Sequence, residues 1–143
     1  MTKHLTTLLL LVLTAFTACN KPTPSREITE DLADQVWAFS LAHPDGFTLD
    51  IRTMTEPTEG IAVSYAETQG SHSREQLPKV IRHALDHDGY VGGWLDTSDS
   101  LYYYDSTRLF PEDSPEAALQ FGRDNGQTAV FILSTGTEIT CNR

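Results

Sequence analysis

The chain has 143 residues, with 10 Lys and Arg against 20 Asp and Glu and a formal net charge of −10. This length fits one domain, and the hydrophobic content of 39% excludes both a disordered acidic tail and a multispan membrane protein. The excess of acid argues against nucleic acid as a partner, because affinity for nucleic acid comes mostly from Lys and Arg side chains that neutralise phosphates.

The start of the chain has the pattern of a secretory signal. Met1-Thr2-Lys3-His4 is a short positive segment, and an apolar run of residues 5–16 follows it. The run is too short to cross a bilayer of ~30 Å as a helix, and small residues come directly after it, as they do at a signal cleavage site. We therefore expect residues 1–18 to be a signal peptide that is removed on export.

Thr17-Ala18-Cys19 resembles the lipobox of bacterial lipoproteins, although Phe16 stands where the common pattern has Leu. In that family the Cys is lipidated and becomes the first residue of the mature chain. The resemblance implies that acyl chains such as palmitate on Cys19 anchor the protein in the bacterial cell envelope, at the outer membrane or on the periplasmic face. The alternative is an ordinary signal that is cleaved nearby and leaves Cys19 as a chance thiol.

The segment after the signal has the composition of a linker. Residues 19–26 are polar and contain Pro22 and Pro24, as expected between a lipid anchor and a single domain of residues 27–143. If Cys19 is acylated, Cys141 has no partner within the chain. We therefore expect the domain to fold without a disulfide, although its destination is oxidising.

Apolar periodicity and turn residues divide the domain into helices and strands. Ile28, Leu32, Val36 and Phe39 recur at helical spacing and predict a first helix that ends before Pro44. The other predicted elements are, in chain order, strands at 47–52 and 61–65, a helix at 77–85, strands at 90–95 and 101–104, a helix at 115–124 and a strand at 127–133.

This order, α-ββα-ββα-β, predicts an α+β domain. Strands that are joined by short turns favour antiparallel pairing. We therefore expect a single, mostly antiparallel sheet of about five strands with the helices packed on it. Gly92-Gly93 inside a predicted strand indicates a bulge or a close approach of a neighbouring backbone.

A set of short motifs lies between Gly46 and Ile139. They are Gly92-Gly93-Trp94 with Asp96, Tyr103-Tyr104-Asp105-Ser106, Phe110, Ala117-Ala118 and Asn125-x-Gln127-x-Ala129-x-Phe131. In these motifs the chain resembles a family of small, uncharacterised domains found in bacterial lipoproteins. A similar pattern occurs in terminal domains of phage and conjugative-element polyproteins, some of which are grouped with barnase-like and RelE-like ribonucleases. The resemblance implies a fold more than an activity, because a fold does not carry function without its site.

Two histidines could form part of a metal site. His83 and His87 are four residues apart on one helix, a spacing that lets two imidazoles hold one metal, but Ala84 replaces the Glu of the H-E-x-x-H pattern. A third ligand would have to come from His72 or Asp88. A solvated helix face explains the pair equally simply, and we expect no bound metal and no other cofactor.

Ribonuclease-like chemistry needs a proton acceptor, a proton donor and a cation for the developing charge on phosphorus. The residue types for such a group exist in the chain, but the sequence does not show whether they converge. The candidates are Glu67, His72, Tyr103, Arg123 and Gln127. The alternative is ordinary polarity of strands and loops.

Aromatic residues concentrate on two neighbouring predicted strands, in Trp94 and in the run 102–104. Alternation along a strand sends Tyr103 to one face of the sheet and its two neighbours to the other. One face must be core, and the other then presents aromatic surface beside Asp105, a composition suited to contact with a protein or a glycan. We expect Trp94 to be a buried contact, and Asp105 could equally cap a following loop.

Three hypotheses follow from these patterns. The first is a non-catalytic lipoprotein of the cell envelope that binds a partner, with Trp94, Tyr103 and Asp105 as its binding residues. The second is a ribonuclease-like enzyme or a relative of a toxin, and the third is a metal-dependent module. We adopt the first, because neither of the other two has a complete set of chemical groups.

Overall fold

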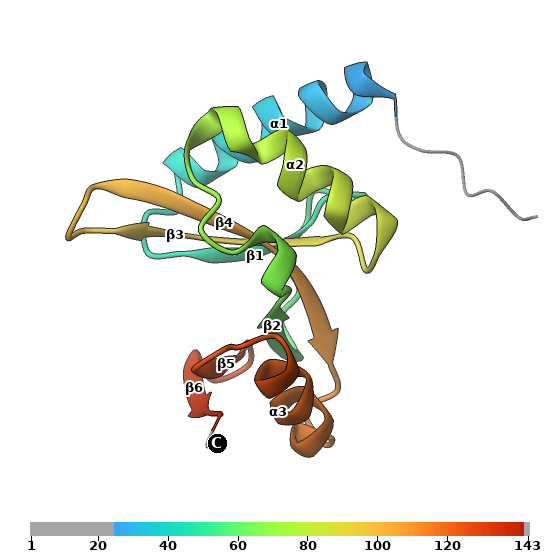
Figure 1. Cartoon of the computed structure of the whole chain (residues 1–143), viewed down its shortest axis with the longest axis vertical. Coiled ribbons are helices and arrows are strands. Elements are labelled where there is room, and N and C mark those ends of the chain that lie inside the picture. The colour runs from blue at the N-terminus through green and yellow to red at the C-terminus, as the bar shows by residue number, and fades with distance from the viewer. Residues whose placement is uncertain (1–24, 142–143) are drawn as a thin grey trace, which may run out of the picture.

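The computed structural model describes residues 25–141 (Figure 1). It contains three α-helices, six strands and one short 3-10 helix, η1. These elements are α1 (Arg26–Leu41), β1 (Phe47–Asp50), β2 (Ile61–Ser64), η1 (Ala66–Thr68), α2 (Ser73–Asp86), β3 (Tyr90–Asp96), β4 (Leu101–Phe110), α3 (Pro115–Asp124), β5 (Ala129–Ile132) and β6 (Thr137–Thr140).

All six strands form one antiparallel sheet in the order β1-β3-β4-β2-β5-β6. The predicted α+β class and the single antiparallel sheet are confirmed, and the sheet contains β6 as a sixth strand. The ten-residue strand β4 pairs with β3 from Leu101 to Thr107 and with β2 from Thr107 to Phe110. β4 therefore joins the two halves of the sheet into one body.

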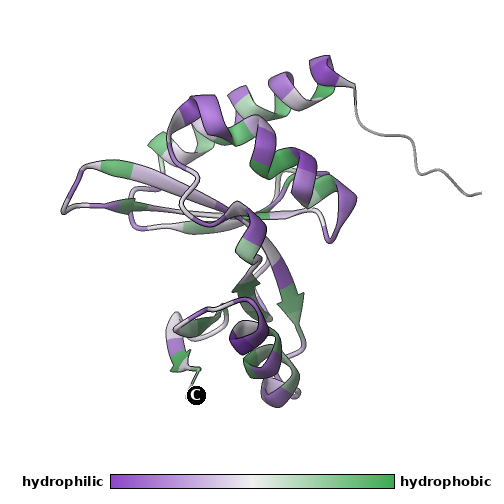
Figure 2. Ribbon diagram, viewed as in Figure 1, coloured by the Kyte–Doolittle hydropathy of each residue, from purple (hydrophilic) through white to green (hydrophobic). Residues whose placement is uncertain are grey.

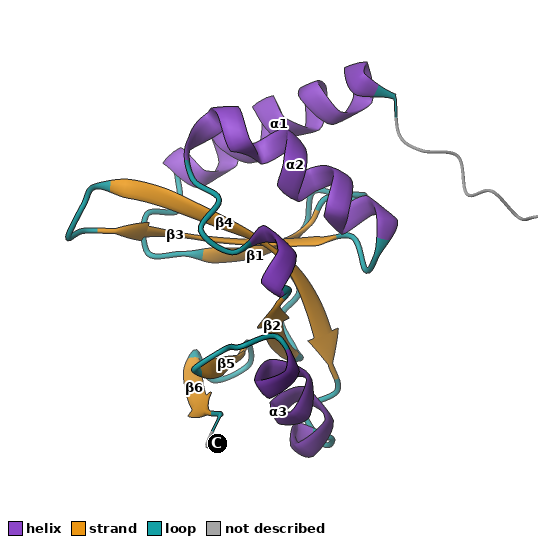
Figure 3. Cartoon of the chain, viewed as in Figure 1, coloured by secondary structure: helices purple, strands orange, loops and turns teal. Residues whose placement is uncertain are grey.

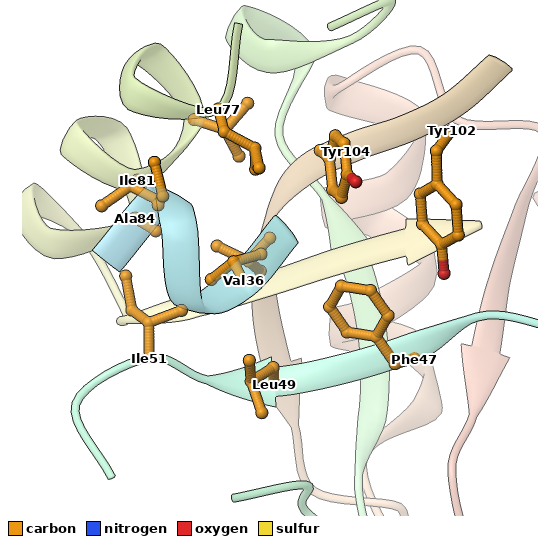
Figure 4. Packing of buried hydrophobic residues seen from close by; sticks show 12 residues of the cluster. Val36, Phe47, Leu49, Ile51, Leu77, Ile81, Ala84, Tyr102 and Tyr104 are labelled. Carbon is orange, nitrogen blue, oxygen red and sulfur yellow. The ribbon is translucent and has the colours of Figure 1, made fainter. Parts of the chain in front are cut away.

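The larger core lies between one half of the sheet and the helices α1 and α2. Figure 4 shows Val36 of α1 and Leu77 and Ile81 of α2 above the side chains of β1, with Tyr102 and Tyr104 of β4 beside them. Tyr102 and Tyr104 of β4 are 8% and 0% exposed and belong to this core. The hydroxyl groups of Tyr104 and Ser40 are 2.7 Å apart and hydrogen-bonded, so that a buried tyrosine is tied to α1.

The smaller core lies between α3 and the other half of the sheet. It contains Val63 of β2, Val130 of β5 and Ala118 of α3. Figure 2 shows the hydrophobic residues of β2 and of the end of β4 next to α3. Val63 and Val130 lie on the same side of the sheet as Tyr104, because the strand register alternates without interruption between them. All three α-helices therefore pack against one face of the sheet. Figure 3 shows α1 and α2 over the half of the sheet with β1 and β3, and α3 beside β2 and β5.

The opposite face carries no helix of the described residues, and we call it the open face. In Figure 1 the part of the sheet with β1 and β3 lies at an angle to the part with β2, β5 and β6, and β4 runs through both parts. The sheet is therefore bent, and the helices lie on the outside of the bend. The strand residues of the open face are Thr48, Asp50, Ala62, Ser64, Tyr90, Gly92, Trp94, Asp96, Leu101, Tyr103, Asp105, Thr107, Leu109, Ala129, Phe131, Glu138 and Thr140.

The predicted signal peptide of residues 1–18, the lipidation site Cys19 and nearly all of the predicted linker lie outside the described residues. Within residues 25–141, no helix has the length and the apolar character that a membrane span requires. Cys141 is buried and has no disulfide partner among the described residues. A Cβ atom added to Gly122 of α3 would lie 2.7 Å from the Sγ atom of Cys141.

Candidate functional site: the open face of the sheet

Trp94 of β3 and Tyr103 of β4 form a stacked aromatic pair on the open face. They are direct partners in the strand register, with ring centroids 5.5 Å apart and an angle of 18° between the ring planes. The predicted alternation is present, because Tyr102 and Tyr104 belong to the core and Tyr103 lies on the other face. The expected burial of Trp94 is wrong, since 43% of its surface is exposed.

Glycines on two sides of Trp94 explain its exposure. In the register of β1 and β3, the residue next to Phe47 and opposite Trp94 is Gly46, and Gly92 precedes Trp94 on the same face. Gly46 has φ +108°, and a Cβ there would lie 3.2 Å from the carbonyl oxygen of Gly93. A residue other than glycine is therefore disfavoured at position 46, and no side chain stands beside the indole on the β1 side.

The Gly92-Gly93 pair is a close approach and not a bulge, because the pairing of β3 with β4 continues through it. A Cβ on Gly93 would meet the ring of Phe47 at 2.8 Å and the ring of Tyr102 at 3.0 Å. A Cβ on Gly92 would meet the hydroxyl of Thr107 at 2.9 Å. The absence of a side chain at Gly93 thus leaves room for two core rings on one face. The absence of a side chain at Gly92 lets Thr107 approach on the other face.

Polar neighbours fix the orientation of Tyr103. Its hydroxyl donates a hydrogen bond of 2.8 Å to Oδ2 of Asp99, in the turn between β3 and β4, and this bond raises the pKa of the phenol. The ring of His72 meets the ring of Tyr103 edge to face, with centroids 5.7 Å apart. His72 also pairs with Tyr103 as an isolated bridge on the β2 side of β4. The ring of Tyr103 therefore lies between Trp94 and His72, and its hydroxyl is fixed by the hydrogen bond to Asp99.

Asp105 lies in the middle of the open face. It is inside β4 opposite Gly92, so the prediction that it caps a loop is wrong. Only 4% of its surface is exposed, and its Oδ1 atom is buried without a hydrogen-bond partner among the described residues. Burial raises the pKa of this carboxyl to about 6, and the hydroxyl of Ser64 opposes part of the rise. The open face thus contains a buried acid that the protein leaves incompletely paired.

His83 and His87 are close, but residues 25–141 place no third metal-ligating side chain with them in a cluster. Their rings stack at 3.9 Å with an angle of 11°, and Tyr65 contacts both rings at 4.9 Å. Burial and then the neighbouring His87 lower the pKa of His83. His72 precedes the first turn of α2 whereas His83 is in its last turn, and Oδ2 of Asp88 accepts a hydrogen bond from Tyr65.

The residues of the ribonuclease-like hypothesis do not form one group. No hydrogen bond or ion pair joins any two of Glu67, His72, Tyr103, Arg123 and Gln127, and the contact between His72 and Tyr103 is the one ring contact among them. Glu67 instead lies 3.9 Å from His83, and Arg123 donates to Gln120 on the same helix. Nor do the described residues contain a cluster of three His, Cys, Asp or Glu that could hold a metal ion.

Comparison of the chain with models of protein families, with curated proteins and with solved structures found no match. The assignment of a function therefore rests on the geometry of the open face.

The sequence named Trp94, Tyr103 and Asp105 as candidate binding residues, and the structure brings them to one face; it did not single out Gly46 and Asp99, which lie beside them. Asp99 had a local signal, because it precedes Tyr103 by four residues across a short turn. Gly46 had none, because its place beside Trp94 depends on the pairing of β1 with β3, whose partners are 40 to 46 positions apart in the sequence. Such long-range pairings are not visible in a single sequence.

Proposed function

We propose that this protein is a lipid-anchored protein of the bacterial cell envelope that binds a partner without catalysis, and that it binds through the open face around Trp94 and Tyr103. The observation that carries the proposal is the stacked pair itself. A half-exposed tryptophan on a helix-free sheet face leaves aromatic area in water that a globular domain ordinarily buries.

Three properties of the pair support contact with a partner. Aromatic side chains supply much of the binding free energy in interfaces. The ring of Tyr103 is already fixed by Asp99 and His72, so little side-chain entropy remains to be lost on binding. The indole is kept accessible by glycine at position 46, where the backbone conformation itself disfavours a larger residue. Together these features describe a preorganised aromatic surface.

The lipid anchor is the second part of the proposal, and it rests on the lipobox-like segment ending at Cys19. An acylated Cys19 would hold the domain near a membrane through a linker of a few residues. The domain would then meet its partner at the membrane surface, in the envelope compartment to which the signal directs it.

The binding half is tested by capture from intact cells after crosslinking, with tagged wild-type protein and three variants. We expect Trp94→Ala and Tyr103→Ala to lose the captured partner. Ile28→Ala is the matched control, because it removes an apolar side chain that is 54% exposed on α1, away from the open face. Capture that is equal for all four proteins would contradict a binding surface at Trp94.

A further inference from the structure

We infer that the partner presents a basic segment to the open face, with an Arg or Lys side chain laid on Trp94 and with Asp105 supplying the opposite charge. The inference deepens the proposed function and rests on it, since it names the chemistry of the partner at the same surface.

The charges of the open face select for a cation. Its strand positions carry the acids Asp50, Asp96, Asp105 and Glu138 and no Lys or Arg. Arg108 of β4 points to the other face, where its guanidinium lies over the rings of Phe110 and Phe121 at 5.0 and 5.4 Å. A ligand on this face therefore meets only negative charge from the strands beneath it, which favours basic partners and repels acidic ones.

The aromatic pair adds a surface on which a cation can lie. Tryptophan attracts ammonium and guanidinium groups over its ring face better than other side chains do. One ring face of Trp94 stacks on Tyr103, and towards β1 the neighbouring residue is Gly46, without a side chain. The free side of the indole is thus open to a flat or elongated cationic group, and the planar guanidinium of Arg matches it best.

Asp105 gives an independent reason to expect a positive ligand. The carboxyl is 4% exposed, and its Oδ1 atom has no hydrogen-bond partner among the described residues. Trp94 is the diagonal neighbour of Asp105 across β3 and β4, a relation that places two side chains within about 7–8 Å on one face. A cation over the indole is therefore within range of an incompletely compensated carboxylate, whose field is weakly screened because it is buried.

The shape of the face favours an extended segment over a small molecule. Two cavities of about 470 and 240 Å³ open on the described surface, and neither is lined by Trp94, Tyr103 or Asp105. The open face instead carries two exposed aromatic side chains on different strands, Trp94 (43% exposed) on β3 and Phe131 (40% exposed) on β5. An extended chain segment can contact several of these side chains and place successive basic groups near the acids, whereas a small cation can contact only one part of the face.

The test is calorimetric titration of the full-length mature protein with end-blocked nine-residue peptides in which Gly alternates with Arg or with citrulline. Citrulline keeps the shape of Arg and removes its charge. We expect the Arg peptide to bind at least tenfold more tightly than the citrulline peptide, and its affinity to fall as salt is added. Trp94→Ala and Asp105→Asn should each weaken the Arg peptide at least fivefold.

Glu116→Gln is the matched control for Asp105→Asn, because it removes one acidic charge from an exposed position of α3 and should leave binding unchanged. A thermal melt of each variant verifies that it is folded. Equal binding of the Arg and citrulline peptides, or equal binding by wild type and Asp105→Asn, would overturn the inference.

Two further probes identify the competing occupants. Spermine that binds as tightly as the Arg peptide would assign the face to a free polyamine and overturn the peptide segment. A neutral hexasaccharide, such as a chitin oligomer, that binds while the Arg peptide does not would overturn the cation in favour of a glycan. In either case a partner captured from cells in a Trp94-dependent manner leaves the proposed function standing, so the two proposals fail separately.

Discussion

Asp105 is the residue at which the stability of the domain and the binding of a cation are expected to oppose each other. Its pKa is raised from an ordinary 3.8 to about 6 by burial. Below about pH 4 the carboxyl is protonated in both the folded and the unfolded chain, so its raised pKa does not lower the free energy of unfolding. Between about pH 4 and 6 the unfolded chain releases the proton and the folded chain retains it, so the free energy of unfolding falls as the pH rises.

We therefore predict that Asp105→Asn stabilises the domain at neutral pH. Each unit of pKa is worth about 1.4 kcal/mol, so the rise from 3.8 to about 6 sets an upper value of about 3 kcal/mol. Denaturant melts of the wild type and the variant from pH 4 to 8 measure the difference, which should grow with pH up to about 6 and then remain constant. A difference that is independent of pH would contradict the raised pKa.

Three aromatic residues of β3 and β4 should respond differently to truncation. Tyr104 is fully buried, and we predict that Tyr104→Ala costs about 3–5 kcal/mol, because it leaves a cavity and removes the bond to Ser40. Trp94 is exposed and Tyr103 is only partly buried, so Tyr103→Ala and Trp94→Ala should each cost about 1 kcal/mol or less. Denaturant melts of the three variants test this ranking, and a Tyr103→Ala variant as unstable as Tyr104→Ala would show that the faces of β4 are assigned the wrong way round.

At the scale of the elements, the β3–β4 hairpin depends on the absence of a side chain at position 93. An added methyl group at Gly93 would lie 2.8 Å from the ring of Phe47 and 3.0 Å from that of Tyr102. We predict that Gly93→Ala destabilises the domain by about 1–3 kcal/mol through overpacking. The double variant Gly93→Ala with Phe47→Leu should cost less than the sum of the single variants, since a smaller side chain makes room. Strict additivity in denaturant melts would contradict this packing.

The sequence predicted the class of the elements and the alternation along β4, because these depend on local periodicity. On α1 it predicted Val36, which is buried, and Leu32 and Phe39, which pack against the larger core, but it did not predict the two ends of the buried face. The expected stripe begins with Ile28, which is 54% exposed, whereas Thr29 and Ser40 are buried. These two polar residues tolerate burial because each hydroxyl is hydrogen-bonded, to the carbonyl of Ser25 and to the hydroxyl of Tyr104. A hydropathy pattern does not show such hydrogen-bond partners, so it does not predict that these polar residues are buried.

The order of the strands was equally hidden, and it decides the exposure of Trp94. β1 and β2 follow one another in the chain, but β3 and β4 lie between them in the sheet. Gly46 therefore comes to lie beside Trp94 only once β1 has paired with β3. The aromatic composition of the candidate site was visible in the sequence, and its openness was not, because openness depends on these non-local pairings.

At the scale of the whole molecule, we propose that a lipid on Cys19 anchors the domain of one sheet and three helices. We predict that Cys19→Ala releases the protein from membranes, because the acyl chains are its proposed anchor. Cys141→Ala is the matched control, since Cys141 is a buried residue of the smaller core and should not affect anchoring. Membrane fractionation and incorporation of labelled palmitate measure both. A Cys19→Ala variant that stays with membranes, together with a wild type that takes up no label, would contradict the anchor.

The central claim is that the open face around Trp94 and Tyr103 binds the partner, and site-specific photo-crosslinking in intact cells tests it most directly. A benzophenone amino acid at position 103 keeps an aromatic ring beside Trp94, and the same group at position 28 reports on the helical side. The account predicts a discrete covalent adduct from position 103 and none from position 28. An adduct from position 28 alone, or none from position 103, would contradict it.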